Sequence, residues 1–253
     1  MKQLSQYGIC PEWDAPSSIL AVSTTRNNVG FSNPPFDKLN LGLHVGDNKQ
    51  TVLNNRQLLP FQNMGWLEQT HSTTVIELTS SMLESPPEMG FQADASFTFE
   101  PDVTCVVMTA DCLPILLCDR NATWVAAIHA GWKGLANGVI ESTLESIEKQ
   151  SGFALNKSEI SAWIGPAIGQ KSYTVGADVY HHFQDYPFAL EVGETSKMRL
   201  GLSLVAQCKL AQLGVSDILG GEHCTFSEPQ HFFSYRRDGQ TGRMASLISI
   251  QSN

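Results

Sequence analysis

The sequence predicts a single domain of mixed α and β structure. Two apolar, β-branched runs, 103–108 and 124–128, have the composition of buried strands. Both runs lead into polar residues at the strand end, where α/β folds commonly place their chemistry. An amphipathic helical pattern follows Gly134. No repeat, linker or low-complexity tract interrupts residues 1–253, so we expect one domain over that range.

Composition indicates a compact soluble protein. The 253 residues are 42% hydrophobic and 16% charged, which suffices to bury a core without disulfides. The formal net charge of −9 argues against binding to nucleic acid or to an anionic membrane. The N-terminal residues lack the apolar core of a signal peptide, and no later apolar run reaches transmembrane length. We therefore expect a cytoplasmic protein that is monomeric by default.

Patterns in the N-terminal half predict strands separated by polar loops. Asp47 stands where an N-cap is expected, because apolar residues continue at helical spacing until Pro60. His71 falls in a break between two strand patterns, where a lone histidine is usually structural. Residues 93–99 alternate as in a half-buried strand. The other expected elements are a strand at 18–24, a helix at 48–59, a strand, break and strand within 65–78, and a loop at 80–90.

The central strands separate the cysteines into two kinds. Cys105 shares a strand face with Val103 and Val107, so we expect a buried apolar thiol there, and another at Cys118 in the next strand. Cys112 differs because it lies past the end of its strand, between an aspartate and a Leu-Pro pair. The six cysteines show no C-x-x-C pair, so most are expected to be core thiols in a reducing compartment.

The C-terminal half continues with helices and strands. We expect helices over 135–152, 178–183 and 203–213, and strands over 160–164 and 246–250. The start of the first helix, beside Lys133, would offer free N–H groups to an anion. Arg236, Arg237 and Arg243 are concentrated in an acidic chain, and they form either a salt-bridged structural cluster or an oxyanion pocket.

His71, Cys112 and His129 combine two imidazoles with a thiolate, a set that permits three uses. Three protein ligands with a vacant position are typical of a catalytic zinc, which would lower the pKa of bound water to roughly 7. The same donors suit a mononuclear copper. Without a metal, Cys112 could act as a nucleophile with a histidine as its base. Spacing alone leaves these uses open, although the lack of H-x-H pairing argues against a multicopper cluster.

Short motifs along nearly the whole chain carry a family resemblance. The most specific are Thr109-Ala-Asp-Cys-Leu-Pro114 and Ile128-His-Ala-Gly-Trp-Lys-Gly134. Further motifs are Ser23-Thr-Thr-Arg26, Leu39-Asn-Leu-Gly42, His44-Val-Gly-Asp47, Glu68-Gln-Thr-His71, Ala93-Asp-Ala95, Phe233-Ser-Tyr-Arg-Arg-Asp-Gly239 and Thr241-Gly-Arg-Met-Ala-Ser246. On these motifs the chain resembles the YfiH/YlmD family, long labelled multicopper polyphenol oxidase or laccase-domain proteins and later reassigned as purine nucleoside phosphorylases.

The resemblance implies a fold, a metal and an activity. The family's metal ligands correspond to His71, Cys112 and His129, and they imply a single Zn2+ with Cu2+ as the alternative. The implied fold has central mixed sheets flanked by helices and is related to cysteine-hydrolase toxins. The implied activities are phosphorolysis of adenosine, inosine, guanosine and methylthioadenosine, and deamination of adenosine. Some bacterial relatives are instead described as editing amidases acting on a UDP-muramyl peptide.

Three positions depart from the family pattern. Ser72 replaces the glycine that usually follows the first ligand, and Lys133 replaces an arginine, which keeps the charge but loses the bidentate fork. Gly201 stands where the family often has an aspartate. None of the three is a metal ligand, so they bear on substrate range more than on family membership.

Our leading hypothesis is a zinc-dependent enzyme acting on small-molecule substrates, a purine nucleoside and phosphate. Cys112 belongs to the catalytic centre, and Asp111 either transfers protons or positions its neighbours. For substrate and phosphate binding we expect Arg26, Asn40, Lys133 and Arg237, with Arg26 and Lys133 also taking part in catalysis. The alternatives are an amidase acting on a muramyl peptide, a copper-dependent polyphenol oxidase, and a metal-binding accessory protein without turnover.

Overall fold

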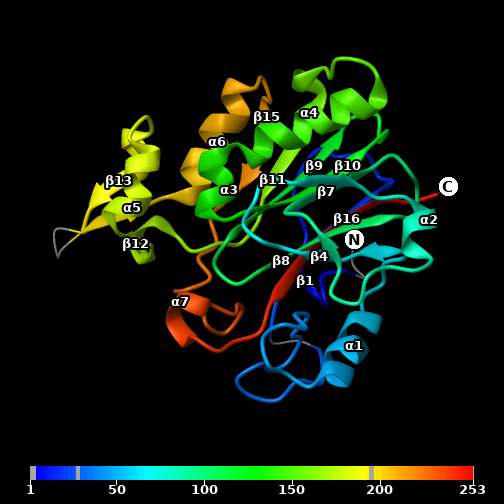
Figure 1. The fold of residues 1–253 in the computed structure, drawn as a ribbon, viewed down its shortest axis with the longest axis horizontal. Coiled ribbons are helices and arrows are strands. Elements are labelled where there is room, and N and C mark those ends of the chain that lie inside the picture. Colours follow the sequence, from blue (N-terminus) through cyan, green and yellow to red (C-terminus); the bar gives the residue numbers. More distant parts are fainter. Residues whose placement is uncertain (1–3, 27–28, 194–196, 253) are drawn as a thin grey trace.

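Two β-sheets lie face to face at the centre of the molecule, with helices on both outer sides (Figure 1). The computed structural model describes residues 4–26, 29–193 and 197–252. The expected mixed α/β fold, with helices flanking central sheets, is confirmed. No helix among these residues combines the length and the apolar character needed to cross a membrane.

The first sheet has the strand order β1-β2-β16-β8-β3. Its strands are β1 (Gly8–Ile9), β2 (Ile19–Thr24), β16 (Met244–Ile250), β8 (Thr104–Thr109) and β3 (Met64–Gly65). The C-terminal strand β16 pairs antiparallel with both β2 and β8. The ends of the chain are therefore joined in one sheet, and β16 holds β8 and the turn after it in place.

The second sheet has the strand order β15-β11-β9-β10-β7-β5. Its strands are β15 (Asp217–Gly220), β11 (Ile160–Ile164), β9 (Leu113–Asp119), β10 (Val125–Ala130), β7 (Ala95–Thr98) and β5 (Val75–Glu77). The antiparallel register of β9 and β10 sets Ala130 opposite Leu113. Because Cys112 directly precedes β9, this register brings its side chain to the edge that carries His129.

Smaller elements surround these sheets. The strands β12 (Thr174–Val175), β14 (Met198–Leu200) and β13 (Leu190–Val192) form a separate sheet, and β4 (Leu67–Glu68) pairs with β6 (Phe91–Gln92). The α-helices are α1 (Lys49–Gln57), α2 (Ser80–Leu83), α3 (Trp132–Asn137), α4 (Val139–Ser151), α5 (Ala177–Tyr180), α6 (Leu202–Gln212) and α7 (Tyr235–Asp238). Short 3-10 turns occupy Lys157–Glu159, Gln170–Ser172, His181–Phe183 and Pro187–Ala189.

Alternation along the central strands sorts the core into layers. In β9, the side chain of Ile115 faces α4 and α6, whereas those of Leu116 and Cys118 face the first sheet. In β8, Cys105 and Val107 face the second sheet. Because both faces of these strands are covered, the strands consist of nearly continuous apolar residues, and the prediction of buried thiols at Cys105 and Cys118 is confirmed.

Two N-terminal predictions need correction. Asn48, and not Asp47, caps α1, because its side-chain oxygen accepts a hydrogen bond from the amide of Thr51 at 3.0 Å. Asp47 instead accepts hydrogen bonds from Ser32 at 2.6 Å and from Asn40 at 3.0 Å, so it ties two loops together. Residues 80–90 are not entirely loop, since α2 occupies their first turn.

Burial and one glycine account for two further differences. The strand predicted as half-buried, β7, is buried along its whole length, because it lies between β10 and β5 and both of its faces are covered. The single helix predicted over 135–152 is divided into α3 and α4 at Gly138, whose φ of 93° is left-handed. The helix also begins earlier than expected, at Trp132, directly after the strand that carries His129.

The α1 cap yields a stability prediction. Replacing Asn48 by Ala removes the acceptor for the Thr51 amide, so the free energy of unfolding should fall by about 1 kcal/mol. Asn54 is a matched control, because it is exposed on the same helix and bonds only Gln50 there. Asn54→Ala should leave stability within about 0.5 kcal/mol of the parent. Urea unfolding of both variants measures the difference, and equal midpoints would contradict the assigned cap.

Candidate metal centre and its cavities

Three side chains from separate turns and strands converge at one point. His71 comes from the turn between β4 and β5, Cys112 from the turn between β8 and β9, and His129 from β10. Their ligand atoms lie within 4.8 Å of one another, and Cys112 Sγ lies 3.6 Å from His71 Nε2. Zinc bonds of about 2.0–2.3 Å place tetrahedral ligand atoms roughly 3.3–3.8 Å apart. The donor set and its spacing therefore fit one zinc or copper ion.

The buried carboxylate of Asp94 supports two of these ligands. Its Oδ1 accepts a hydrogen bond from His129 Nδ1 at 2.7 Å and one from the His71 amide at 2.9 Å. Its Oδ2 accepts hydrogen bonds from the Ser72 amide and hydroxyl, both at 2.7 Å, and from the Thr70 amide at 3.1 Å. Because His129 Nδ1 donates to Asp94, the other ring nitrogen is left as the metal donor.

Electrostatics favours the thiolate of Cys112 and the carboxylate of Asp94. Burial alone would lower the pKa of His129, but the same two groups raise this pKa to about 9, so a metal would have to displace a proton from that ring. Burial alone would raise the pKa of Asp94, but hydrogen bonds from His129 and Ser72 hold it well below its ordinary value. Burial would likewise raise the pKa of the Cys112 thiol, yet the charge of His129 and hydrogen bonds from both histidines lower it. In contrast, burial raises the pKa of Cys105 to about 12. Only Cys112 of this pair is therefore poised as a thiolate.

The backbone around the ligands is tightly constrained. His71 has a φ of 60° and Asp111 a φ of 96°, both in the left-handed region that L-residues seldom adopt. A Cβ atom on Gly131 would lie 2.7 Å from His71 Cδ2 and 3.2 Å from Cys112 Sγ. A side chain at Gly131 would therefore displace the His71 ring or the Cys112 thiol from their present positions.

The structure explains two of the departures from the family pattern. Ser72 has no positive φ, so glycine is not required there, and its hydroxyl adds a hydrogen bond to Asp94. Gly201 is the N-cap residue of α6 and supplies no side-chain cap, which is the contact an aspartate could make. The third departure, Lys133, is exposed on α3 with its ammonium 5.7 Å from the Trp132 ring.

Two cavities meet at Cys112. The larger has a volume of about 560 Å³, and its lining residues are His44, Leu67, Glu68, Gln69, His71, Met89, Met108, Thr109, Ala110, Cys112, His129, Tyr235 and Arg243. The smaller has a volume of about 150 Å³, and its lining residues are Ala110, Asp111, Cys112, Trp132, Ile168, Tyr173, Leu202, Tyr235 and Arg236. Cys112 thus lines both a larger chamber of mixed character and a smaller, mainly aromatic and apolar one.

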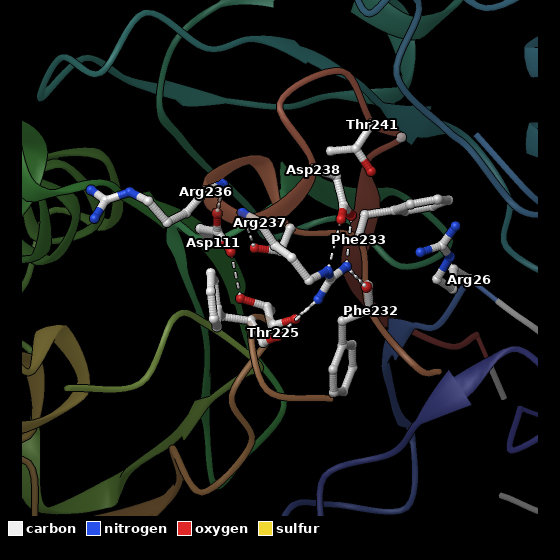
Figure 2. A network of polar contacts seen from close by, with 12 residues as sticks. Arg26, Asp111, Thr225, Phe232, Phe233, Arg236, Arg237, Asp238 and Thr241 are labelled. Carbon is white, nitrogen blue, oxygen red and sulfur yellow. Dashed lines mark hydrogen bonds and ion pairs between the residues drawn. The ribbon is translucent and has the colours of Figure 1, made fainter. Parts of the chain in front are cut away.

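Asp111 is engaged by its neighbours. Its Oδ1 accepts a hydrogen bond from the Thr225 hydroxyl at 2.7 Å and its Oδ2 accepts one from the Arg236 amide at 2.6 Å, as Figure 2 shows. Its own carbonyl accepts a hydrogen bond from the Ile168 amide at 2.9 Å. Of the two roles considered for Asp111, these contacts support positioning, because they hold the turn that presents Cys112.

The arginine cluster divides into structural and cavity-lining members. Arg237 donates to the carbonyls of Thr225, Phe226 and Phe232 and pairs with Asp238 at 2.7 Å, so it forms the structural alternative (Figure 2). Arg243 instead lines the larger cavity. The cluster is therefore not a single oxyanion pocket.

The remaining predicted binding residues lie outside both cavities. Arg26 bonds Asp37, stacks 4.7 Å from the Phe233 ring and lines a different depression with Lys38. Lys133 lines neither cavity. Asn40 is fully buried, with its side chain bonded to Gly42, Asp47 and the Arg243 amide.

Sequence reasoning missed several residues at this site. Asp94 was noted only as part of the Ala93-Asp-Ala95 motif. A carboxylate next to a buried strand is itself a signal, because a buried charge needs hydrogen-bond donors. His44, Glu68 and Tyr235 line the larger cavity, and no spacing rule links them to the ligands. Their proximity arises only when the loops of the two sheets come together.

The Asp94 contacts predict a loss of metal affinity on mutation. In Asp94→Asn one of the two oxygens becomes an amide nitrogen that faces donors, so either His129 and the His71 amide or the Thr70 and Ser72 amides lose their acceptor. Zinc affinity should fall by roughly 10- to 100-fold, measured by competition with a chelator. Asp119→Asn is the control, because Asp119 is also buried but accepts only local amides such as Thr123 at 2.6 Å. An unchanged zinc affinity in Asp94→Asn would refute the supporting role.

Comparisons with known proteins agree with this geometry. Residues 20–251 match the family model described as "Multi-copper polyphenol oxidoreductase laccase". Purine nucleoside phosphorylase YfiH of Escherichia coli strain K12 is 44% identical over 249 residues, covering 95% of this chain and 97% of that protein. The purine nucleoside phosphorylase of Haemophilus influenzae is 44% identical over 252 residues, covering 95% and 98%.

Solved structures show the same fold. A Neisseria meningitidis protein is similar with a TM-score of 0.86 and 41% identity, covering 96% of this chain and 99% of that chain. YlmD from Geobacillus stearothermophilus has a TM-score of 0.84 and 31% identity, covering 93% of each chain. These matches span nearly the whole chain, and the family model covers all three ligand residues. The chain therefore belongs to the multi-copper polyphenol oxidoreductase laccase family, whose relatives include YfiH and YlmD.

Proposed function

We propose that this protein is a zinc-dependent purine nucleoside phosphorylase that also deaminates adenosine. The observation that carries the proposal is the convergence of His71, Cys112 and His129 where two cavities of different character meet. The names of the relatives support the phosphorylase activity. The proposed substrates are adenosine, inosine, guanosine and methylthioadenosine. Copper remains the alternative metal, since the same donors suit it.

The smaller cavity suits a planar heteroaromatic ring. Trp132, Tyr173 and Tyr235 contribute aromatic surfaces, and Ile168 and Leu202 contribute apolar ones. Stacking on aromatic side chains is a general way to hold a nucleobase. We propose that the purine occupies this cavity, with the sugar extending past Cys112 into the larger one, where His44, Glu68, Gln69 and Arg243 supply polar groups.

The proposed reaction exchanges one bond of the nucleoside for another. A phosphate oxygen forms a bond to the anomeric carbon as the glycosidic C–N bond breaks, and the base leaves with the bonding pair and takes up a proton. When bound, zinc would supply a Lewis acid at the vacant position. Asp94 orients His129, and Asp111 holds the Cys112 turn, so these residues preserve the geometry in which substrates are brought together.

The decisive test is incubation of the zinc-loaded protein with adenosine, with and without phosphate. Phosphorolysis should release adenine and ribose 1-phosphate only when phosphate is present, and deamination should release inosine in either case. Cys112→Ser should abolish both and reduce zinc content, because it removes a ligand. Cys208→Ser is the control, since Cys208 lies on α6 outside both cavities. If neither product accumulates with the parent protein, the proposal fails.

The aromatic cavity gives a second prediction. Trp132→Ala should raise KM for the nucleoside by roughly 5- to 100-fold, because base stacking contributes about 1–3 kcal/mol. Zinc content should stay unchanged, which separates loss of stacking from loss of the metal site. Phe153→Ala is the control, because Phe153 is an exposed aromatic residue outside both cavities. A KM unaffected in Trp132→Ala would place the base elsewhere.

The size of the larger cavity favours one alternative. At about 560 Å³ it leaves room for a ligand bulkier than a ribose and phosphate, which suits an amidase acting on a muramyl peptide. That activity would release an amino acid or peptide without phosphate. A laccase-like copper cluster has less support, since the described residues contain one group of three potential ligands, His71, Cys112 and His129.

A further inference from the structure

We propose that the end of the larger cavity formed by Arg243 and His44 is an oxyanion subsite that binds the phosphate co-substrate. This inference deepens the proposed phosphorylase function and rests on it for the identity of the anion. It assigns phosphate binding to residues other than the four predicted from the sequence, which lie outside this cavity.

Arg243 and His44 lie together although they come from opposite ends of the chain. Both line the cavity that contains the three ligand residues. Both also contact Gly42, because a Cβ on that glycine would lie 2.8 Å from Arg243 Cγ and 3.5 Å from His44 Cε1. An anion held between them would share one chamber with Cys112 and the bound sugar.

Arg243 keeps donors available for a ligand. Its Nη1 donates to the carbonyls of Thr241 and Gly242, each at 3.0 Å. Within the part of the chain that the structure describes, its Nε and Nη2 make no hydrogen bond and no carboxylate lies within ion-pair distance. A guanidinium with free donors on one edge is suited to bidentate contact with a phosphate.

The backbone of Arg243 is anchored by Asn40, a residue predicted from its sequence motif to bind substrate or phosphate. Asn40 Oδ1 accepts hydrogen bonds from the Arg243 amide at 2.9 Å and from the Gly42 amide at 3.0 Å. Asn40 Nδ2 donates to Asp47 at 3.0 Å. Asn40 therefore positions the subsite without touching the anion, which explains a polar residue that is fully buried.

Positive charge accumulates at this end of the cavity. Arg56 lies behind it, stacked 3.7 Å from the Trp66 ring and bonded to the Leu41 carbonyl. Burial lowers the pKa of His44, and the charges of Arg243 and Arg56 lower it further. The glutamate in the cavity lining, Glu68, is exposed and accepts a hydrogen bond from Gln92. A bound anion would offset this charge at a place where the described chain gives Arg243 no carboxylate partner.

Equilibrium dialysis of the zinc-loaded protein against radiolabelled inorganic phosphate tests the subsite directly. Arg243→Gln should weaken phosphate binding by about tenfold or more, because it removes charge-assisted hydrogen bonds. His44→Asn, a milder change in case Arg243→Gln does not fold, should weaken it severalfold. Arg120→Gln is the matched control, since Arg120 is exposed and pairs with Asp217 outside the cavity. Zinc content and thermal unfolding confirm that each variant is intact.

Two competing assignments are tested in the same experiment. Arg26→Gln and Lys133→Gln should bind phosphate like the parent. If either variant loses phosphate binding while Arg243→Gln keeps it, the proposed subsite is overturned. Absence of phosphate binding by the parent would overturn it as well. Competition by a nucleoside 5′-monophosphate that is lost in Arg243→Gln would assign the same subsite to the phosphate group of a nucleotide.

Failure of the subsite and failure of the proposed function give different results. In steady-state assays, Arg243→Gln should raise KM for phosphate much more than KM for adenosine, and phosphate-independent inosine formation should be spared. Phosphate binding that depends on Arg243, without any ribose 1-phosphate from the parent, would retain the oxyanion subsite and refute the phosphorylase. If the parent forms ribose 1-phosphate and Arg243→Gln has an unchanged KM for phosphate, the phosphorylase is retained and the oxyanion subsite is refuted.

Discussion

The buried carboxylate of Asp94 is the interaction on which the candidate metal centre depends. One oxygen orients His129 and accepts the His71 amide, and the other binds the Ser72 amide and hydroxyl. A buried charge is costly unless it is fully hydrogen-bonded, so the turn that carries His71 and the ring of His129 are held by the same requirement. The left-handed backbone at His71 is a consequence of directing successive amides to one acceptor.

The stacked sheets bring that carboxylate and the ligands to one edge. β7 supplies the residues that follow Asp94, β10 carries His129, and the turn between β8 and β9 links the two sheets at Cys112. Gly131 then leaves the space that a side chain would otherwise take beside the ligands. Because Cys112 lies at this crossing, one thiol borders both the smaller, aromatic cavity and the larger one.

Positive charge in this acidic chain is divided between structure and binding. Arg237 uses its donors on nearby carbonyls and Asp238, and Arg56 is enclosed against Trp66. Arg243 alone of these three lines the larger cavity. Arginines that cannot be told apart by residue type thus have different roles, because each role depends on which carbonyls and rings surround the guanidinium.

The sequence by itself determined most of the central strands and the family, and it predicted His71, Cys112 and His129 as metal ligands, because hydrophobic periodicity and short motifs are local properties of the chain. It did not identify Asn48 as the cap, Gly138 as the helix break, Asp94 as the common acceptor or Arg243 as a cavity residue. Only the tertiary structure decided these, since each depends on partners brought close by folding. It also showed that Arg26, Lys133 and Arg237 line neither of the two cavities at Cys112. Charge and residue type do not reveal which cavity a side chain reaches, nor that the donors of Arg26 and Arg237 already bond Asp37 and nearby carbonyls.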